Sequence, residues 1–361
     1  MCFKIQHFFQ NFYHNFYILG TSTPTGRFFA TCAVLASHED TQTWATIYKY
    51  LHVDVNLKPT FVLGDGAKAI TNAGNNVFTG HKFCRLMCWA HVHSNLLPKL
   101  KCITAHKKSV SDEILHDIVN IQWSALNEAT FRKSFKLLEK KYLGKYDVVL
   151  NGVIATFLSY MRKVWINSSE FGWYEGAHPR RISNNQGVEG KNMEIKQNHT
   201  FRRRLELGEL VSVLANLVTE WSEEDDKLLE SSRIATLHGE KDSLSLRTNG
   251  YQWYKSNKMA SDKGLRINPK EKYSVSESSE FLLGKVTNLV AINSSEGLKS
   301  GKSLKERAKE RLAHRKVPQS SSFDDYIRIR SSCWILEERD GDFFCDCPVG
   351  MKVKMTVNDY K

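Results

Sequence analysis

The hydrophobic positions of the first hundred residues alternate between short apolar runs and stripes with helical spacing. Residues 17–37 predict two strands around a Thr-Pro-Thr-Gly turn, the second at 27–36. The next segment, 41–51, predicts a helix whose buried stripe is Trp44, Ile47, Tyr48 and Leu51. Two further strand–helix pairs follow, at 61–64 with 67–73 and at 85–88 with 91–100. This order of elements indicates an α/β layer architecture.

The pattern then changes to helices alone over 109–167. One stripe is Ile114, Ile118 and Ile121, and another is Phe131, Phe135 and Leu138. A further periodic helix at 205–221 carries Leu207, Leu210, Leu214, Leu217 and Trp221. Residues 255–322 predict a linker that contains a charged helix at 304–312. Beyond it, alternation predicts a strand at 326–336, a turn at Asp340-Gly341 and a return strand from Phe343 to Cys345.

Composition excludes several classes of protein. The chain has 361 residues, of which 41% are hydrophobic, so it is long enough for a sizeable core and is not a disordered chain. No apolar run approaches the ~18 residues of a membrane span, and the aromatic N-terminal stretch 1–20 does not resemble a signal peptide. We therefore expect a reducing compartment and no membrane partner. The formal net charge of +12 favours a polyanionic partner.

Asp65 is the first residue that indicates chemistry. It follows the apolar run 61–64 and lies between Gly64 and Gly66. A carboxylate at the end of a strand in an α/β sheet is a suitable oxygen ligand for Mg²⁺. The structural alternative is that Asp65 only caps the helix that begins near Ala67.

Glu189 is the second such residue. If the chain is helical from Gly187, Glu189, Asn192 and Lys196 lie along one face, with Val188 and Ile195 elsewhere. The surrounding segment is strongly basic, with Arg180, Arg181, Lys191, Lys196, Arg202, Arg203 and Arg204. A carboxylate on a cationic surface suits a metal ion that acts on a phosphodiester backbone. The alternative is a solvated helix in which Glu189 is a surface ion-pair partner.

Cysteine and histidine residues form two further groups. Cys88 and His91 are three positions apart, and Cys84 and His93 would complete four zinc ligands, although ten residues is a cramped span for such a site. Packing or a supporting role is the alternative for this group. Cys345 and Cys347 follow the predicted C-terminal strand, but the residues after them, up to Lys361, add no Cys or His. They form at most a partial Zn site, and we expect no complete one in this chain.

In this order, the motifs resemble those of the Mutator-like element (MULE) transposases and the proteins derived from them. The similar segments are GDGAKAITNAG at 64–74, RLMCWAHVHSN at 85–95, SNNQGVEGKNMEIK at 183–196 and FFCDCP at 343–348, preceded by the strand-turn-strand at 20–44. The resemblance covers about 16–230, and the last segment is similar to the first half of a SWIM-type zinc finger.

The resemblance implies an RNase H-like fold, a mixed sheet flanked by helices, with a helical insertion between the second and third acids and a small C-terminal hairpin. It implies five parts: 1–108 and 171–235 as the two portions of the core, 109–170 as the insertion, 236–322 as linker and charged helix, and 323–361 as the partial finger. It also implies that Asp65 and Glu189 are the second and third carboxylates of a DDE-type Mg site for two-metal DNA chemistry. Cys88 and His91 match the C-x-x-H motif of the family.

The chain departs from the family at both ends. Residues 1–38 contain no Asp or Glu, the first acids being Glu39 and Asp40, and the position expected for the first metal-binding acid falls near Lys4. Both ends look truncated or replaced. We therefore expect a DNA-associating, nuclear, catalytically impaired protein. The alternatives are a protein-interaction module that retains the fold and, ranked last, an active nuclease.

Overall fold

The computed structural model describes two compact units. The first comprises residues 1–99, 160–173 and 181–235, and the second comprises 100–159, 174–180 and 236–361. Within these units the described residues are 2–11, 14–22, 28–80, 84–168, 171–177, 183, 186–201, 203, 205–231, 289–293, 297–299, 301–314, 320, 322–339, 342–346 and 355–356. Residues 255–288 of the predicted linker 255–322 lie outside the described residues, as does the turn at 340–341. Within the same linker, Leu289–Asn293 form a strand, so the linker prediction is wrong there.

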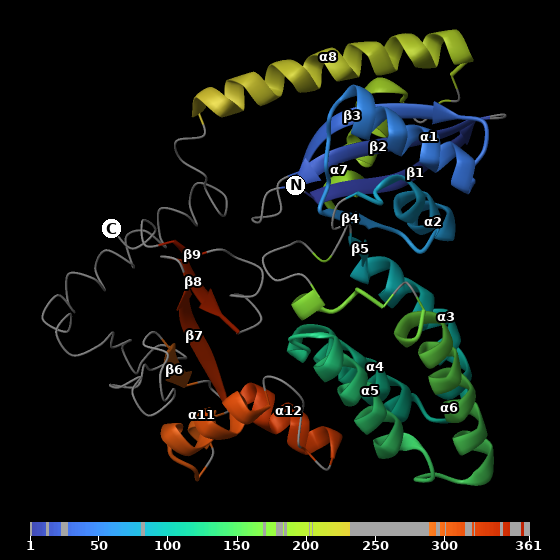
Figure 1. The fold of residues 1–361 in the computed structure, drawn as a ribbon. Helices are drawn as coiled ribbons and strands as arrows, with labels where there is room; N and C mark the ends of the chain where they lie inside the picture. The colour runs from blue at the N-terminus through green and yellow to red at the C-terminus, as the bar shows by residue number, and fades with distance from the viewer. Residues whose placement is uncertain are drawn as a thin grey trace, which may run out of the picture. The chain divides into compact units, whose positions relative to one another are not determined.

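The first unit is built on a five-stranded mixed sheet (Figure 1). Its strands are β1 (Cys2–Asn11), β2 (His14–Ser22), β3 (Phe28–Ala36), β4 (Phe61–Gly64) and β5 (Cys84–Met87). They lie in the order β3-β2-β1-β4-β5. The pairs β1–β2 and β2–β3 are antiparallel, whereas β1–β4 and β4–β5 are parallel. The strands predicted at 17–37, 61–64 and 85–88 are confirmed, but the residue pattern does not predict β1.

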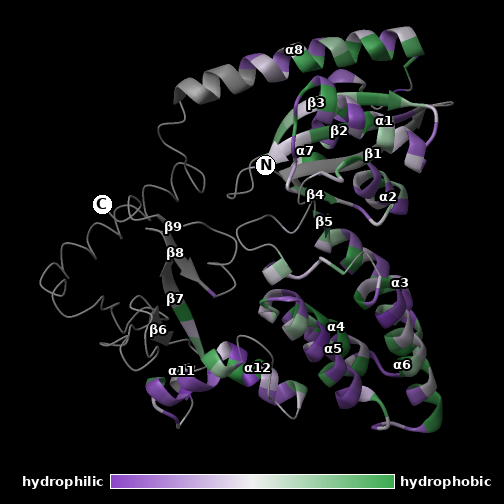
Figure 2. Cartoon of the chain, in the orientation of Figure 1, coloured by the Kyte–Doolittle hydropathy of each residue, from purple (hydrophilic) through white to green (hydrophobic). Residues whose placement is uncertain are grey.

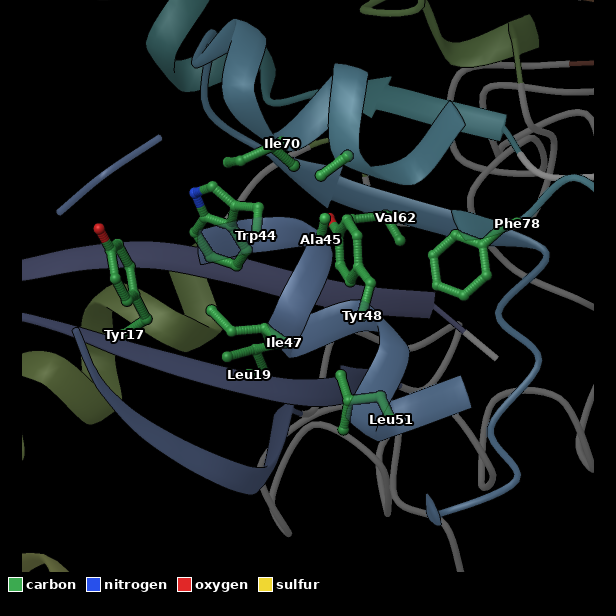
Figure 3. Packing of buried hydrophobic residues seen from close by; sticks show 11 residues of the cluster. Tyr17, Leu19, Trp44, Ala45, Ile47, Tyr48, Leu51, Val62, Ile70 and Phe78 are labelled. Carbon is green, nitrogen blue, oxygen red and sulfur yellow. The ribbon is translucent and has the colours of Figure 1, made fainter. Parts of the chain in front are cut away.

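Helices from the N-terminal part of the chain cover one face of this sheet. They are α1 (Thr41–Lys49), continued by a π-helical turn at Tyr50–Asp54, and α2 (Lys68–Val77). The predicted stripe Trp44, Ile47, Tyr48 and Leu51 is confirmed as buried, and it packs with Tyr17, Leu19 and Val62 of the sheet (Figure 3). Tyr17 meets Trp44 edge-on, with ring centroids 4.7 Å apart. Burying each large side chain of this kind contributes roughly 1.5–3 kcal/mol.

The opposite face of the sheet is covered by helices from much later in the sequence. These are α7 (Gln186–Glu194), extended by a π-helical turn at Ile195–His199, and α8 (Leu207–Ser231). Val188 and Ile195 of this segment, together with the buried side of α8, pack against Phe16, Ile18, Phe28 and Ala30. Hydrophilic and hydrophobic residues alternate along α8 (Figure 2). Leu210, Leu214, Leu217 and Trp221 are buried as predicted, but Leu207, the first residue of α8, is 50% exposed.

Helices α3 (Trp89–His106) and α6 (Val148–Met161) cross the boundary between the units, at Lys99 and Tyr160. The second unit also contains α4 (Lys108–Ser124) and α5 (Glu128–Tyr142), and a π-helical turn at Arg162–Ile166 follows α6 in the first unit. These helices confirm the all-helical prediction for 109–167, and both predicted stripes are buried. An Asn127–Thr130 capping box begins α5, and a single turn at Glu175–Ala177 follows later.

The C-terminal part of the second unit has its own antiparallel sheet. Its strands are β6 (Leu289–Asn293), β7 (Cys333–Arg339), β8 (Asp342–Cys345) and β9 (Met355–Thr356), in that order. A short turn at Gly297–Lys299 precedes α11 (Leu304–Ala313), which confirms the charged helix and begins with a Ser303–Glu306 capping box. The return strand at 343–345 is also confirmed.

The strand predicted at 326–336 is wrong over its first half. Residues Phe323–Ser331 form a helix, α12, and β7 begins only at Cys333. Ser322 caps this helix by accepting a hydrogen bond from the Asp325 backbone. Two aspartates in the first turn also stabilise the helix, because their negative charges lie at the positive end of the helix dipole. The buried residues of α12 are Phe323, Tyr326, Ile329 and Arg330, which recur with helical rather than alternating spacing.

Two buried arginines lie against a single aspartate in this region. Arg311 is fully buried, and its guanidinium lies 3.0 Å (Nη2) from Oδ1 of Asp346 and donates from Nε to Oδ2 at 3.1 Å. Arg330 Nη1 lies 3.6 Å from the same carboxylate, and Arg330 Nε donates to the Ser124 carbonyl of α4. Asp346 Oδ1 also accepts a hydrogen bond from the Ile335 backbone at 2.7 Å. The carboxylate therefore ties the end of β8 to α11, α12 and β7.

Lys141 is a second polar connection within the second unit. Its Nζ lies 2.8 Å from Asp117 of α4 and 2.8 Å from Asp324 of α12, and Tyr142 donates a hydrogen bond to Asp117 at 2.7 Å. Helices α4, α5 and α12 are thus joined by charge as well as by apolar packing.

No helix in the part of the chain that the structure describes is long and apolar enough to cross a membrane.

Candidate functional site

Asp65 lies directly after β4, where the chain leaves the sheet and turns toward α2. Its Oδ1 accepts a hydrogen bond from the Ala67 backbone at 3.1 Å. Ala67 is the N-cap residue of α2 and has no side-chain cap of its own. The helix-capping interpretation therefore accounts for one carboxylate oxygen, and Oδ2 accepts no hydrogen bond from the described residues.

Arg85 of β5 binds the backbone of this turn through hydrogen bonds from its side chain. Its buried guanidinium donates to the carbonyl oxygens of Val62 at 3.3 Å and of Asp65 and Leu86. A Cβ at position 64 would lie 3.1 Å from Arg85 Nη2, so glycine leaves room for the guanidinium beside the strand. Arg85 is not among the predicted site residues, because a single Arg in a short apolar run gives no sign of what it binds.

Tryptophans lie next to the same turn. The Trp165 ring would be 3.7 Å from a Cβ at Gly66, and the Trp165 carbonyl accepts a hydrogen bond from Trp173 Nε1 at 2.9 Å. Trp173 is stacked on Trp89, with centroids 5.3 Å apart. These rings come from three separate stretches of the chain, so residue spacing gives no sign of their association with Asp65.

Cys88 directly precedes α3, and His91 lies in the first turn of that helix, beside the turn that carries Asp65. Cys88 is fully buried, and its backbone donates to the Gly64 carbonyl at 3.0 Å. A hydrogen bond with the Cys88 side chain raises the pKa of His91; burial opposes this effect, while the negative charges of Asp65 and Glu189 reinforce it. Both carboxylates therefore lie within electrostatic reach of one imidazole.

The four-ligand zinc arrangement of Cys84, Cys88, His91 and His93 is not formed. Cys84 Sγ lies 3.9 Å from the Arg85 carbonyl, and His93 meets the Trp89 ring edge-on at 5.7 Å. Among the described residues, no group of three or more His, Cys, Asp or Glu side chains could hold a metal ion.

Glu189 lies on α7, as predicted, and its side chain is half-buried. Asn192, however, lies on the buried stripe with Val188 and Ile195, at 7% exposure, and is not part of a solvated polar face. The α-helix ends at Glu194 and continues as a π-helical turn, which alters the register of Lys196. The predicted line of Glu189, Asn192 and Lys196 is therefore interrupted.

The basic segment around α7 is described only in part. Arg203 is exposed, Lys196 is half-buried, and Lys191 pairs with Glu194 at 3.0 Å. Arg180, Arg181, Arg202 and Arg204 lie outside the described residues. So does Cys347, and Cys345 is placed only as the last residue of β8.

The acids near the predicted first strand have other contacts. Asp40 caps α1 by accepting a hydrogen bond from the Thr43 backbone at 2.8 Å, which lowers the pKa of Asp40. Lys4 in β1 is paired with Leu63 in β4, two residues before Asp65. The strand beside β4 therefore has a lysine near the level of Asp65.

No family model matches the chain, and no curated protein matches it significantly.

Proposed function

We propose that this chain is a nuclear, DNA-associating protein with a MULE transposase-like, RNase H-like core and without efficient DNA cleavage. The observation that carries the proposal is the sheet, with β2 antiparallel to β1 and with β4 and β5 parallel to it on the other side. Asp65 lies at the end of β4, and Glu189 lies on a helix that packs against the same sheet. The negative charges of both carboxylates contribute to the raised pKa of His91.

DNA is the partner that the charge of the chain favours. The net charge is +12, and exposed Arg203 lies just beyond the helix that carries Glu189. Positive side chains beside a phosphate-directed carboxylate pair would bind the duplex through its backbone, with little dependence on base sequence. Duplex binding should consequently weaken steeply as salt rises.

The lack of cleavage follows from the number of carboxylates. Two Mg²⁺ ions bring four positive charges, and Asp65 and Glu189 offset two of them. Mg²⁺ bound here would polarise a phosphodiester. However, Lys4 occupies the position in β1 where the first metal-binding acid is expected, and Asp40 caps a helix instead. The residues of this chain can hold and orient a phosphate without completing a two-metal centre.

The binding test compares two triple variants of the full chain on a duplex of about 30 base pairs at several salt concentrations. Replacing Arg202, Arg203 and Arg204 by Ala should reduce the slope of log affinity against log salt by about one for each phosphate contact that the substitutions remove. The control replaces Lys299, Lys305 and Lys309, three exposed lysines of the second unit, and should leave the slope unchanged. Equal slopes in both variants would reject this DNA surface and favour the protein-interaction alternative.

The cleavage test uses supercoiled plasmid with Mg²⁺ or Mn²⁺. We expect no nicking above the level of a double Asp65→Ala, Glu189→Ala variant. Robust nicking that either single substitution abolishes would show that another residue replaces the missing acid.

A further inference from the structure

Phe201 is an exposed aromatic residue in an unusual backbone conformation. It is 65% exposed, and its φ of 50° lies in the left-handed region, which is strained for a bulky side chain. The other described non-glycine residue with a positive φ is Asn56, and asparagine is a residue type that adopts this conformation readily. The chain therefore holds an apolar ring in solvent at a conformational cost that burial of the ring does not offset.

A tight turn fixes the position of Phe201. The Arg203 backbone donates a hydrogen bond to the Thr200 carbonyl at 2.8 Å, so Phe201 is the second residue of a four-residue turn. Thr200 is 6% exposed, and its backbone donates to the Ile195 carbonyl at 3.0 Å. On the other side of the turn, Leu205 is buried in the core that α8 forms with the sheet. Because both sides of the turn are anchored, the ring is presented to solvent on a short, constrained segment.

The residues around this ring are positively charged. Residues 195–205 contain four Lys or Arg and no Asp or Glu, and three of the four, Arg202, Arg203 and Arg204, follow Phe201 directly. Arg203 is exposed like Phe201. An apolar ring beside several guanidinium groups matches a partner that offers stacked apolar faces between negative charges, and the bases and phosphates of DNA have this arrangement.

We propose that Phe201 is a wedge that inserts between two neighbouring base pairs of a DNA duplex while the arginines after it bind the flanking phosphates. This inference rests on the proposed function, because it takes duplex DNA as the partner. Insertion of an apolar side chain unstacks one step and kinks the duplex, and the constrained turn reduces the entropy that the protein loses on binding. Pyrimidine–purine steps unstack most easily, so the wedge favours flexible steps without reading base edges.

The test uses the duplex of the salt titration with 2-aminopurine placed next to a pyrimidine–purine step, since the fluorescence of this base rises when it loses its stacking. Binding of the parent chain should raise the fluorescence. Binding should also be roughly tenfold tighter when the base pair beside the step is mismatched, because unstacking then costs less. Phe201→Tyr keeps the ring and should behave like the parent.

Phe201→Asn is the decisive variant, because asparagine suits the left-handed conformation of the turn and has no ring. It should abolish the rise in fluorescence and the preference for the mismatched duplex. The slope of log affinity against log salt should stay the same, since no charge is removed. The melting temperature should be unchanged or higher. The matched control is Tyr50→Ala, which removes a ring that is 57% exposed and follows α1, and it should bind both duplexes like the parent.

A parent chain that binds the duplex with a steep salt dependence but leaves the fluorescence unchanged would overturn the wedge and leave the proposed function standing. The wedge would also be rejected if Phe201→Asn bound both duplexes like the parent, or if it melted at a clearly lower temperature, since the ring would then stabilise the fold itself. Binding to single strands alone would reject insertion into a duplex. The absence of any salt-dependent DNA binding would reject both proposals.

Discussion

Replacing Asp346 by Asn should destabilise the second unit far more than the removal of an ordinary surface charge. Asn has nearly the same shape as Asp, so the substitution removes the negative charge and leaves the packing almost unchanged. Arg311 is fully buried beside this carboxylate, and Asp346 itself is only 8% exposed. The variant therefore leaves a buried guanidinium without its counter-ion.

The expected magnitude follows from the contacts of the carboxylate. It holds Arg311 Nη2 at 3.0 Å, accepts a hydrogen bond from Arg311 Nε at 3.1 Å and accepts another from the Ile335 backbone at 2.7 Å. Removing one partner of a buried ion pair costs about 3–5 kcal/mol. An asparagine oxygen can keep one of these bonds, so we expect the free energy of unfolding to fall by about 3 kcal/mol, the lower end of that range.

The assay is urea unfolding followed by circular dichroism and by tryptophan fluorescence, since the Arg311 guanidinium lies 4.8 Å from the ring centroid of Trp334. The matched control is Asp324→Asn, the same substitution at a carboxylate that pairs with Lys141 at 2.8 Å but is 74% exposed. Exposed pairs contribute little, so this control should lower the free energy of unfolding by less than about 1 kcal/mol.

A double-mutant cycle tests the reasoning itself. Arg311→Met removes the buried cation, so combining it with Asp346→Asn should cost clearly less than the sum of the two single substitutions, by about 2 kcal/mol or more. Additive effects, or equal effects of Asp346→Asn and Asp324→Asn, would show that the buried pair is not the source of the stability.

Two further predictions concern the same region. A Cβ at Gly297 would lie 1.8 Å from both Arg307 Nη1 and the Ser332 carbonyl, so Gly297→Ala should lower the free energy of unfolding by about 1–3 kcal/mol. The control is Gly301→Ala, which has open space around it and should change the free energy of unfolding by less than ~0.5 kcal/mol. Burial lowers the pKa of His314 below its ordinary value near 6.5, so the unfolded chain binds the proton more readily and stability falls as the pH drops through 6.5. In urea titrations between about pH 7.5 and about pH 5, the stability of His314→Gln should therefore fall less than that of the parent, and identical decreases would contradict this assignment.

The elements with strong local periodicity are predictable from the sequence. The stripe of Trp44, Ile47, Tyr48 and Leu51 and the isoleucines of α4 are buried where their spacing places them. Helix α12 is not predictable in this way, because apolar and polar residues around Tyr326 and Ile329 also alternate over a short stretch, as they do in a strand. The Ser322 cap is a weaker sequence signal than this alternation. Strand β1 escapes prediction because Lys4, Gln6 and His7 interrupt its apolar run, although it pairs locally with β2 as well as with the distant β4.

The candidate site is predictable only for residues whose chemistry is visible in their immediate sequence. Asp65 at a strand end and Glu189 on a helix are placed as expected. Arg85 and Trp165 escape prediction, because each reaches the Asp65 turn from another segment of the chain. Asn192 is predicted on a polar face, although its spacing from Val188 and Ile195 also matches a buried stripe. Asparagine is usually exposed, and this preference of the residue type points away from the stripe on which it lies.

The two faces of the first sheet have different consequences for synthesis of the chain. One face is closed by α1 and α2, so its core is complete once residue 78 has emerged from the ribosome. The other face is covered only after residues 188–221 have been synthesised, more than a hundred positions later. At ordinary translation rates this is a delay on the order of ten seconds, during which Phe16, Ile18 and Phe28 have no cover. The nascent chain therefore presents an apolar β-surface to chaperones, and fragments that end before α7 should aggregate even though half of their core is already built.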